Sequence, residues 1–339
     1  MFVAIILLGI FTGLAVIPID TSPLVSHPHR IAEYVTAVAT YDTVRTAERD
    51  VVMADGGSLI YVHGHRTPRA IVLVHGLTNS PRQFRELGQQ FYERGYNVIV
   101  PRMQEHGLRA ADIALLKTLT AEKYRDYADR AVDIASGLGD SVFVIGLSAG
   151  GNVAAWIAQR RPDVTRVIVI APAITLGRVP GLLDAPAMNM MTRVPNITIR
   201  QKPDTARPHA YFGTSTRGLA ETLRFGATIM AADDEAPMVR DVTFVLNAND
   251  RTVDEGPALH LAELWLERVG TTTSTYRFDG TLALPHDVID VTQLCAMPDV
   301  VYPVLIALME KAPPPPPPTV SSSPCGAAAG NPRAASSMR

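Results

Sequence analysis

The sequence predicts an α/β fold with a mostly parallel central sheet and helices on both of its faces. Short apolar segments alternate along the chain with longer segments whose apolar residues recur at helical spacing. The short segments are apolar throughout, which is typical of parallel strands buried on both faces. The chain has 339 residues, 47% of them hydrophobic, which is enough for one large domain with an insertion.

The elements follow in a regular order. A hairpin comes first, because Asp55-Gly56-Gly57 is a turn signature between two apolar stretches, 51–54 and 58–62. The further expected strands are 71–74, 97–100, 141–145, 166–170, 242–246 and 274–278. The expected helices are 81–94, 120–136, 149–156, 256–269 and 291–311.

One long segment interrupts this alternation. Residues 172–240 lie between two strands and are too many for a single crossover, so we expect an inserted cap, with a helix over 214–230. The segment contains five methionines: Met188, Met190, Met191, Met230 and Met238. Flexible methionines suit an adaptable apolar surface over a ligand, and they equally suit gaps in a core.

The two ends of the chain differ from the domain in composition. Residues 2–18 carry no charge, and as a helix they would span about 25 Å, slightly less than a bilayer core. We expect residues 1–18 to be a membrane anchor or a signal peptide, which places the protein in the cell envelope. Residues 19–46 are expected to be a linker, 47–311 the domain, and 312–339 a disordered proline-rich tail.

Charge and cysteine content exclude several classes of partner. The net charge is −2 and no basic patch appears, so no nucleic acid partner is expected. The chain has no CxxC or HExxH pattern, and neither a metal nor a cofactor is expected. Of the two cysteines, Cys295 and Cys325, the second lies in the low-complexity tail, so no structural disulfide is expected.

A G-x-S-x-G motif, Gly146-Leu147-Ser148-Ala149-Gly150, follows one predicted strand and precedes a helix. Such a sharp turn strains the serine backbone and requires nearly side-chain-free neighbours. It also places the hydroxyl at a helix N-terminus, where free N–H groups favour negative charge. The motif predicts that Ser148 is a nucleophile.

A serine nucleophile needs a base, and the base needs an orienting carboxylate. In this fold they follow the serine in the order acid, then histidine, on loops after later strands. Asp250 directly follows the strand 242–246 and is the predicted acid; Asp254 is the second choice because it is placed to cap the next helix. His286 follows the last predicted strand and is the predicted base.

The oxyanion formed during acyl transfer needs two backbone N–H donors. We expect one from Ala149, directly after the serine, and one from Leu77, on the loop after the strand 71–74. His75 and His106 resemble bases, but their positions on early loops favour a structural role.

These motifs together resemble the α/β-hydrolase superfamily and, more narrowly, bacterial carboxylesterases and monoacylglycerol-lipase-like hydrolases, a group often labelled serine aminopeptidase-like. The similar segments, within residues 48–311, are Val74 to Thr78, Pro101-Arg102 with Glu105 to Gly107, Gly146 to Gly151, Asn249 to Val253 and Leu284 to Asp287. The resemblance implies an α/β-hydrolase fold with Ser148 as nucleophile, Asp250 as acid and His286 as base. Relatives often have Gly-His-Gly where this chain has Glu105-His106-Gly107.

The sequence therefore predicts a serine hydrolase of carboxylic esters. Acylglycerols or lysophospholipids are the expected substrates, because the cap is rich in Met and Leu, and residues 2–18 provide for membrane attachment. The same three residues can also serve an amidase, a peptidase or an acyltransferase. A more distant alternative is a tethered binding protein without catalytic activity.

Overall fold

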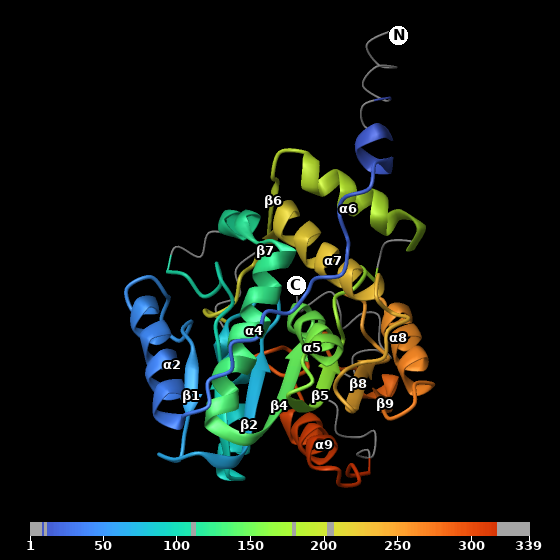
Figure 1. The fold of residues 1–339 in the computed structure, drawn as a ribbon. Coiled ribbons are helices and arrows are strands. Elements are labelled where there is room, and N and C mark those ends of the chain that lie inside the picture. Colours follow the sequence, from blue (N-terminus) through green and yellow to red (C-terminus); the bar gives the residue numbers. More distant parts are fainter. Residues whose placement is uncertain (1–8, 10–11, 110–112, 178–180, 202–206, 317–339) are drawn as a thin grey trace, which may run out of the picture.

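The computed structural model describes residue 9 and residues 12–109, 113–177, 181–201 and 207–316 (Figure 1). Its strands are β1 (Leu59–Tyr61), β2 (Thr67–Val74), β3 (Tyr96–Val100), β4 (Gly139–Leu147), β5 (Val164–Ile170), β6 (Thr198–Arg200), β7 (Gly213–Ser215), β8 (Asp241–Asn247) and β9 (Thr272–Phe278). Its α-helices are α2 (Tyr34–Glu48), α3 (Arg85–Glu93), α4 (Ala121–Leu138), α5 (Ala149–Arg160), α6 (Asp184–Arg193), α7 (Thr216–Met230), α8 (Gly256–Leu266) and α9 (Pro298–Glu310). Short 3-10 helices are η1 (Pro81–Phe84), η2 (Ile113–Thr118), η3 (Gly181–Leu183) and η4 (Gly280–Leu282).

The central sheet has seven strands in the order β1-β3-β2-β4-β5-β8-β9. All neighbouring pairs are parallel except β1 with β3. One buried cluster packs α2, α4, α5, α7 and α8 on one face, and a second packs α3 and α9 on the other (Figure 1). Coverage of both faces explains why the inner strands are apolar throughout, and the predicted parallel architecture is confirmed.

The predicted hairpin at the start of the domain is wrong. Only β1 forms, and it pairs with β3 instead of with residues 51–54. The Met53 N–H donates to the carbonyl of Gly107 at 2.7 Å, and Val52 makes an isolated bridge with Leu108. The Asp55–Gly57 turn therefore packs against a distant loop, a contact that the local turn signature does not reveal.

The predicted linker over 19–46 contains a helix, α2, that belongs to the core. Ala37 and Tyr41, four residues apart, are buried against α4. Gly137 on α4 permits the close approach, since a Cβ at that position would lie 2.7 Å from the Cβ of Ala37. The apolar residues of α2 are spread around the helix and only Ala37 and Tyr41 among them are buried, so the periodicity was too weak for the sequence to predict this helix.

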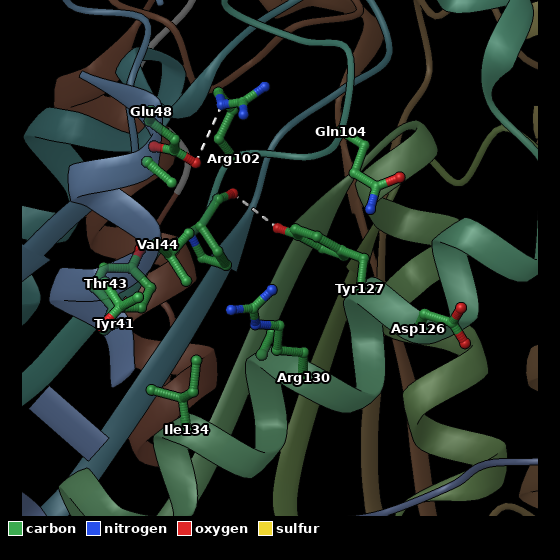
Figure 2. A pocket seen from close by; sticks show the side chains of 13 residues that line it. Tyr41, Thr43, Val44, Glu48, Arg102, Gln104, Asp126, Tyr127, Arg130 and Ile134 are labelled. Atoms are coloured by element: carbon green, nitrogen blue, oxygen red, sulfur yellow. Dashed lines mark hydrogen bonds and ion pairs between the residues drawn. The ribbon is translucent and has the colours of Figure 1, made fainter. Parts of the chain in front are cut away.

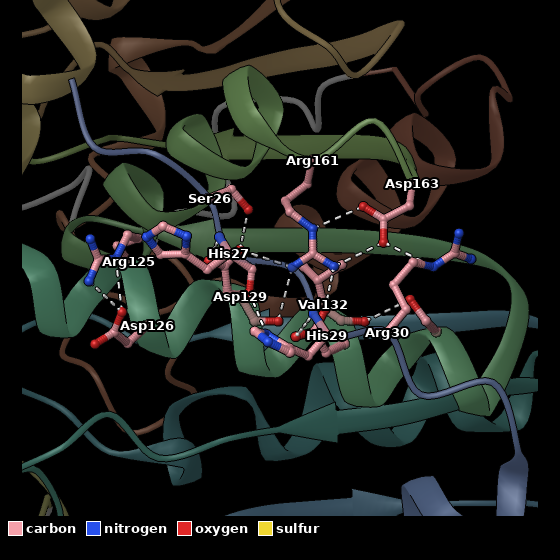
Figure 3. A network of polar contacts seen from close by, with 12 residues as sticks. Ser26, His27, His29, Arg30, Arg125, Asp126, Asp129, Val132, Arg161 and Asp163 are labelled. Atoms are coloured by element: carbon pink, nitrogen blue, oxygen red, sulfur yellow. Dashed lines mark hydrogen bonds and ion pairs between the residues drawn. The ribbon is translucent and has the colours of Figure 1, made fainter.

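The segment before α2 is held by a buried cation on α5's C-terminal side (Figure 3). The Arg161 side chain is fully buried and pairs with Asp129 at 3.0 Å and Asp133 at 2.7 Å. The remaining oxygens of these two carboxylates accept the backbone N–H groups of His27 (2.7 Å) and His29 (2.8 Å). The lead-in is thereby fixed across α4 on its way from the cap to α2.

The cap segment 172–240 forms α6, α7 and the two-stranded β6–β7 sheet. Helix α7 docks on α5 of the main domain at Gly226, where a Cβ would lie 3.2 Å from Nδ2 of Asn152. The Val239 N–H donates to the carbonyl of Ala158 at the cap's other end (3.0 Å). The segment that the sequence predicts as an insertion thus covers one end of the sheet's helical layer (Figure 1).

The end segments extend beyond the described residues. Among the described residues, no helix is long and apolar enough to cross a membrane. Most of the predicted anchor 2–18 and most of the tail 312–339 lie outside this part of the chain. Cys295 is disulfide-bonded, which contradicts the expectation of no structural disulfide, and Cys325 lies outside the described residues.

Helix α9 is shorter than the predicted 291–311. Residues 291–297 form turns, in which the Gln293 N–H donates to the carbonyl of Asp290 at 3.0 Å. The helix begins at Pro298, because proline at the first helical position has a suitable φ and no N–H to satisfy.

Candidate active site

Ser148 lies at the turn between β4 and α5, with φ 60° and ψ −116°. This positive φ is unusual for a residue with a side chain and indicates local strain. Its N–H donates to the carbonyl of Ile170 at 3.0 Å, and its carbonyl accepts from the N–H groups of Asn152 and Ala173 at 3.0 and 3.1 Å. Backbone bonds therefore hold the strained turn in place and expose the serine side chain at its apex.

The two glycines of the motif are required by close backbone approach. A Cβ at Gly146 would lie 1.9 Å from the carbonyl oxygen of Gly150. A Cβ at Gly150 would lie 2.1 Å from the carbonyl oxygen of Val74 on the neighbouring strand. Any side chain at either position would push α5 away from β2 and β4, so the motif follows from packing around the turn.

His286 and Asp250 form a hydrogen-bonded pair after β9 and β8. The distance between His286 Nδ1 and Asp250 Oδ2 is 2.6 Å. The opposite ring nitrogen, Nε2, is buried and has no hydrogen-bond partner among the described residues. Proton transfer from a serine requires a histidine whose Nδ1 is hydrogen-bonded to a carboxylate and whose Nε2 is free to accept the proton. His286 has this arrangement.

Several groups act on the pKa of the Asp250 carboxyl. Burial of this side chain raises its pKa, but the hydrogen bond and charge of His286, together with N–H groups of Thr252 and Val253, outweigh burial and lower the pKa. The Thr252 N–H lies 2.8 Å from Oδ1. Asp250 is therefore ionised at neutral pH and holds the proton of the imidazole on Nδ1.

Asp254, the second choice for the acid, lies just before α8, whose N-cap residue is Glu255. Its Oδ1 accepts the Gly256 N–H at 2.9 Å, a local bond at the start of the helix. Asn247, which the sequence did not single out, fixes the loop of the base by donating to the carbonyls of Leu284 (3.1 Å) and Pro285 (2.9 Å). The sequence signal that could have identified Asn247 is its position as the last residue of β8, next to the predicted acid loop.

The expected oxyanion donors flank the serine. A Cβ built on Gly76 would lie 3.6 Å from the Cβ of Ser148, so the loop after β2 passes directly beside the nucleophile. Within the described part of the chain, neither the Leu77 N–H nor the Ala149 N–H donates to an acceptor. Two unused donors beside one hydroxyl can stabilise a developing oxyanion.

One buried amide links the oxyanion loop to the loop of the base. Gln83, on η1, accepts the Gly76 N–H at its Oε1 (2.8 Å) and donates from Nε2 to Asp287 Oδ2 (2.7 Å). Its side chain is buried. Sequence reasoning missed this residue because its two partners lie 7 and 204 positions away and no motif connects them.

His75 and His106 are buried and structural, as expected. His75 Nε2 accepts the Met103 N–H at 3.1 Å, and Nδ1 faces the carbonyl of Gly76 at 2.9 Å. His106 Nε2 faces the carbonyl of Leu77 at 2.7 Å. Burial lowers the pKa of His75 well below its ordinary value and that of His106 to about 4, so both rings are neutral braces of the oxyanion loop.

The loop that carries His106 is braced in turn from α2 (Figure 2). A separate cavity of about 380 Å³ lies between α2 and α4. At its edge Arg102 pairs with Glu48 at 3.1 Å and donates to the carbonyl of His106 at 2.8 Å. The helix that the sequence missed therefore supports, through one arginine, the loop in which this chain departs from Gly-His-Gly.

Ser148 and His286 line the same cavity, of about 360 Å³, beneath the cap. Its apolar side chains include Leu77, Leu147, Leu176, Phe212, Leu219 and Val253. Polar side chains at the cavity include Asn79, Gln201, Arg207, Thr214 and Gln293. Both apolar and polar side chains thus line the cavity.

The five cap methionines do not line this cavity. Met188 is buried in the protein and Met238 is half exposed to solvent. The expectation that methionines form the surface over a ligand is therefore wrong, because the cap residues at the cavity are Leu219 and Thr222 of α7 together with residues around β6 and β7, among them Gln201, Phe212 and Thr214. Methionine content does not specify which face of a helix it occupies.

Comparisons with known proteins agree with this geometry. Residues 65–264, more than half of the chain, match the family described as serine aminopeptidase, S33. The thermostable monoacylglycerol lipase of Bacillus sp. (strain H-257) is 25% identical over 207 residues, covering 56% of this chain and 74% of that protein. Phospholipase YtpA of Bacillus subtilis (strain 168) is 26% identical over 137 residues, covering 40% and 52%.

Solved structures show the same fold. A structure of the metagenome-derived lipolytic enzymes LipS and LipT has a TM-score of 0.56 and 22% identity, covering 77% of this chain and 99% of that one. A monoglyceride lipase from Saccharomyces cerevisiae, with a substrate analogue, has a TM-score of 0.55 and 14% identity, covering 77% and 94%. The chain has the α/β-hydrolase fold and belongs to the serine aminopeptidase S33 family.

Proposed function

We propose that Ser148, His286 and Asp250 form a catalytic triad that hydrolyses acyl esters of lipids. The chain is a carboxylic ester hydrolase. Which residues catalyse the reaction, and which ester is hydrolysed, is what we propose. The observation that carries it is the 2.6 Å bond between His286 Nδ1 and Asp250 Oδ2, which leaves the buried Nε2 bare in the cavity that Ser148 lines.

In the proposed reaction, Ser148 Oγ attacks the acyl carbon while His286 Nε2 takes the hydroxyl proton. The ionised Asp250 stabilises the imidazolium that forms. The N–H groups of Leu77 and Ala149 bind the oxyanion. His286 then protonates the leaving alcohol, and the same base activates water to release the acid and restore Ser148.

The mixed apolar and polar lining of the cavity supports an amphiphilic substrate. Leu176, Leu219 and Val253 offer an apolar surface to an acyl chain, while Gln201 and Thr214 offer hydrogen bonds to a polar head group. Two relatives are a monoacylglycerol lipase and a phospholipase. We therefore propose monoacylglycerols or lysophospholipids as the substrate class, with residues 2–18 attaching the enzyme to a membrane of the cell envelope.

A head-group and chain-length panel tests this proposal. Wild type is expected to hydrolyse monoacylglycerols or lysophospholipids of medium chain length, and Ser148→Ala is expected to show no activity above the solvent rate. With p-nitrophenyl esters, activity should extend to octanoate. Activity that peaks at acetate and vanishes by octanoate contradicts the substrate assignment, and an active Ser148→Ala variant contradicts the triad.

A further inference from the structure

One short stretch of the cap, residues 209–211, is joined to loops of the catalytic edge. The side chains of His209 and Tyr211 are buried there. The Tyr211 N–H donates to the carbonyl of Thr78 on the oxyanion loop at 2.8 Å, and the Tyr211 hydroxyl donates to the carbonyl of Glu105 at 2.9 Å. Tyr211 also lines the catalytic cavity. The cap therefore meets the site at a stretch that is bonded to the loops beneath it.

His209 brings a buried imidazole from the cap to the loop of the base. Its Nε2 lies 2.7 Å from Oδ2 of Asp290, which is 1% exposed and follows His286 by four positions. Burial raises the pKa of the Asp290 carboxyl, but hydrogen bonds from His209 and Thr292 outweigh burial and lower the pKa. The carboxyl is thus ionised at neutral pH. An ionised carboxylate only accepts hydrogen bonds, so His209 Nε2 carries the proton and the bond is charge-assisted.

The same carboxylate is shared with the oxyanion loop. Asn79 Nδ2 lies 3.3 Å from Asp290 Oδ2 and 3.2 Å from Asp287 Oδ2. Asn79 is buried, and its own N–H donates to the carbonyl of Gly76 at 3.2 Å, across the turn that carries Leu77. Side chains from the cap, the oxyanion loop and the loop of the base therefore meet at one oxygen of Asp290.

The bond from His209 is the shorter of the two at this oxygen. Without it, Asp290 Oδ2 would keep only the 3.3 Å contact with Asn79. Leaving a buried charged acceptor short of a donor is costly, so the loop would shift toward other partners. The Asp290 N–H donates to Oδ1 of Asp287, the residue next to His286, at 3.0 Å. A shift at Asp290 would therefore reach the base, where a displacement of about 1 Å can cost about 100-fold in rate.

We propose that His209 is a positioning residue for ester hydrolysis. Through Asp290 it sets the loop of His286, and through the shared oxygen it sets the loop of Leu77. The cap then aligns the base and an oxyanion donor in addition to covering the cavity. This inference rests on the proposed function, because it takes His286 as the base and Leu77 as a donor. It predicts that His209 governs the rate of the chemical step more than the binding of substrate.

A second pair of the same chemistry provides a matched control. His260 Nε2, on α8, lies 3.3 Å from Asp233 Oδ2, in the turn that follows α7. This side-chain pair is 54% and 31% exposed, and neither residue lines the catalytic cavity. Removal of the His260 imidazole should therefore leave kcat and KM unchanged.

The first experiment compares two amides at position 209, in the full chain and with a water-soluble short-chain ester. In His209→Gln the amide N–H takes the place of Nε2, whereas in His209→Asn the side chain is too short to reach Asp290. His209→Asn should lower kcat by about 10- to 100-fold and change KM by less than about threefold. His209→Gln should recover most of kcat, and His260→Asn should behave like wild type. Circular dichroism establishes that each variant is folded at the assay temperature.

The second experiment tests whether His209 acts through Asp290. Both His209→Asn and Asp290→Asn weaken the same bond, so the double variant should lose no more kcat than the more impaired single variant. The rate at which a fluorophosphonate labels Ser148 should fall in the same proportion as kcat, because labelling depends on the same base and oxyanion donors.

Three outcomes overturn the proposal. Wild-type kcat in His209→Asn, with only the free energy of unfolding lowered, would make His209 a structural residue. A rise in KM at unchanged kcat would make it part of the substrate site. Losses that multiply in the double variant would exclude the route through Asp290. Full activity of Ser148→Ala would instead contradict the proposed function, since that variant leaves His209 and its bonds in place.

Discussion

The catalytic edge of the sheet and the cap differ in how directly the sequence reveals them. At the catalytic edge, the site residues follow closely on strands that are recognisable from their own apolar sequence, as Asp250 follows β8, although distant bonds such as Gln83 to Asp287 then join the loops. In the cap, α6 and α7 are positioned by distant partners, such as Asn189 with Ala15. Motifs therefore predict the first region well, whereas composition predicts the second poorly.

The largest effect is expected at the acid of the catalytic edge. Asp250→Asn should lower kcat by about 10⁴-fold, because the amide no longer holds the tautomer that leaves His286 Nε2 free to accept a proton. Asp254→Asn, the matched control, should stay near wild type because Asp254 makes only a local bond, to the Gly256 N–H at the start of α8. Steady-state kinetics with a chromogenic ester measures both. Equal losses in the two variants would contradict the assignment of the acid.

The strained turn predicts a large effect on stability. Gly150→Ala should lower the free energy of unfolding by more than about 3 kcal/mol, because its Cβ would lie 2.1 Å from the carbonyl oxygen of Val74. Gly181→Ala in the cap is the control, since the nearest atom to its Cβ would be 3.9 Å away. Urea denaturation compares the two. A Gly150→Ala variant as stable as wild type would refute the packing account of the motif.

The amide that joins the two catalytic loops predicts an intermediate effect. Gln83→Leu should lower kcat by about 10- to 100-fold with little change in KM, less than the loss of an oxyanion donor itself, because it leaves the Gly76 N–H unpaired and loosens the loop of Leu77. Gln89→Leu, on the exposed side of α3, is the control. A rise in KM with unchanged kcat would show instead that Gln83 shapes the substrate site.

The join between cap and catalytic edge predicts a pH dependence. Asp290 Oδ2 lies 2.7 Å from His209 Nε2. Burial raises the pKa of the Asp290 carboxyl, but hydrogen bonds from His209 and Thr292 outweigh burial and lower the pKa to about 2. A depressed carboxyl pKa stabilises the fold above the unfolded pKa, near 3.8, and the contribution is lost as the pH falls toward 2.

Asp290→Asn should therefore lower the free energy of unfolding by about 2 kcal/mol at neutral pH, and its difference from wild type should shrink as the pH falls from about 4 to 2. Denaturation across this range measures it. A difference that is constant with pH would show that the carboxylate charge does not contribute.

The smallest effect is expected at the cap methionines. Met188→Leu and Met230→Leu conserve volume, and each should cost less than about 1.5 kcal/mol of stability. Neither lines the cavity, so the preference for acyl-chain length should not change, whereas Leu219→Ala should shift it toward longer chains. If Met188→Leu changes the preferred acyl-chain length more than Leu219→Ala does, the assignment of Leu219, and not Met188, to the cavity wall is contradicted.

The outcome of sequence reasoning follows the same division. The six later strands, the turn at Ser148 and the pairing of His286 with Asp250 all agree with predictions that rest on local patterns. The hairpin and α2 depend on which distant segments meet, and the sequence predicted both wrongly. The sequence did not identify Gln83 and Asn247, because each side chain hydrogen-bonds to residues that are distant in the sequence and that only the fold brings near.

Labelling with a fluorophosphonate probe tests the central claim most directly. Wild type should incorporate one probe per chain, on the tryptic peptide that contains Ser148, and Ser148→Ala should incorporate none while its folding, followed by circular dichroism, is unchanged. His286→Ala should label at a greatly reduced rate, because the hydroxyl loses its base. Labelling that persists at another residue in Ser148→Ala would contradict the account of the site.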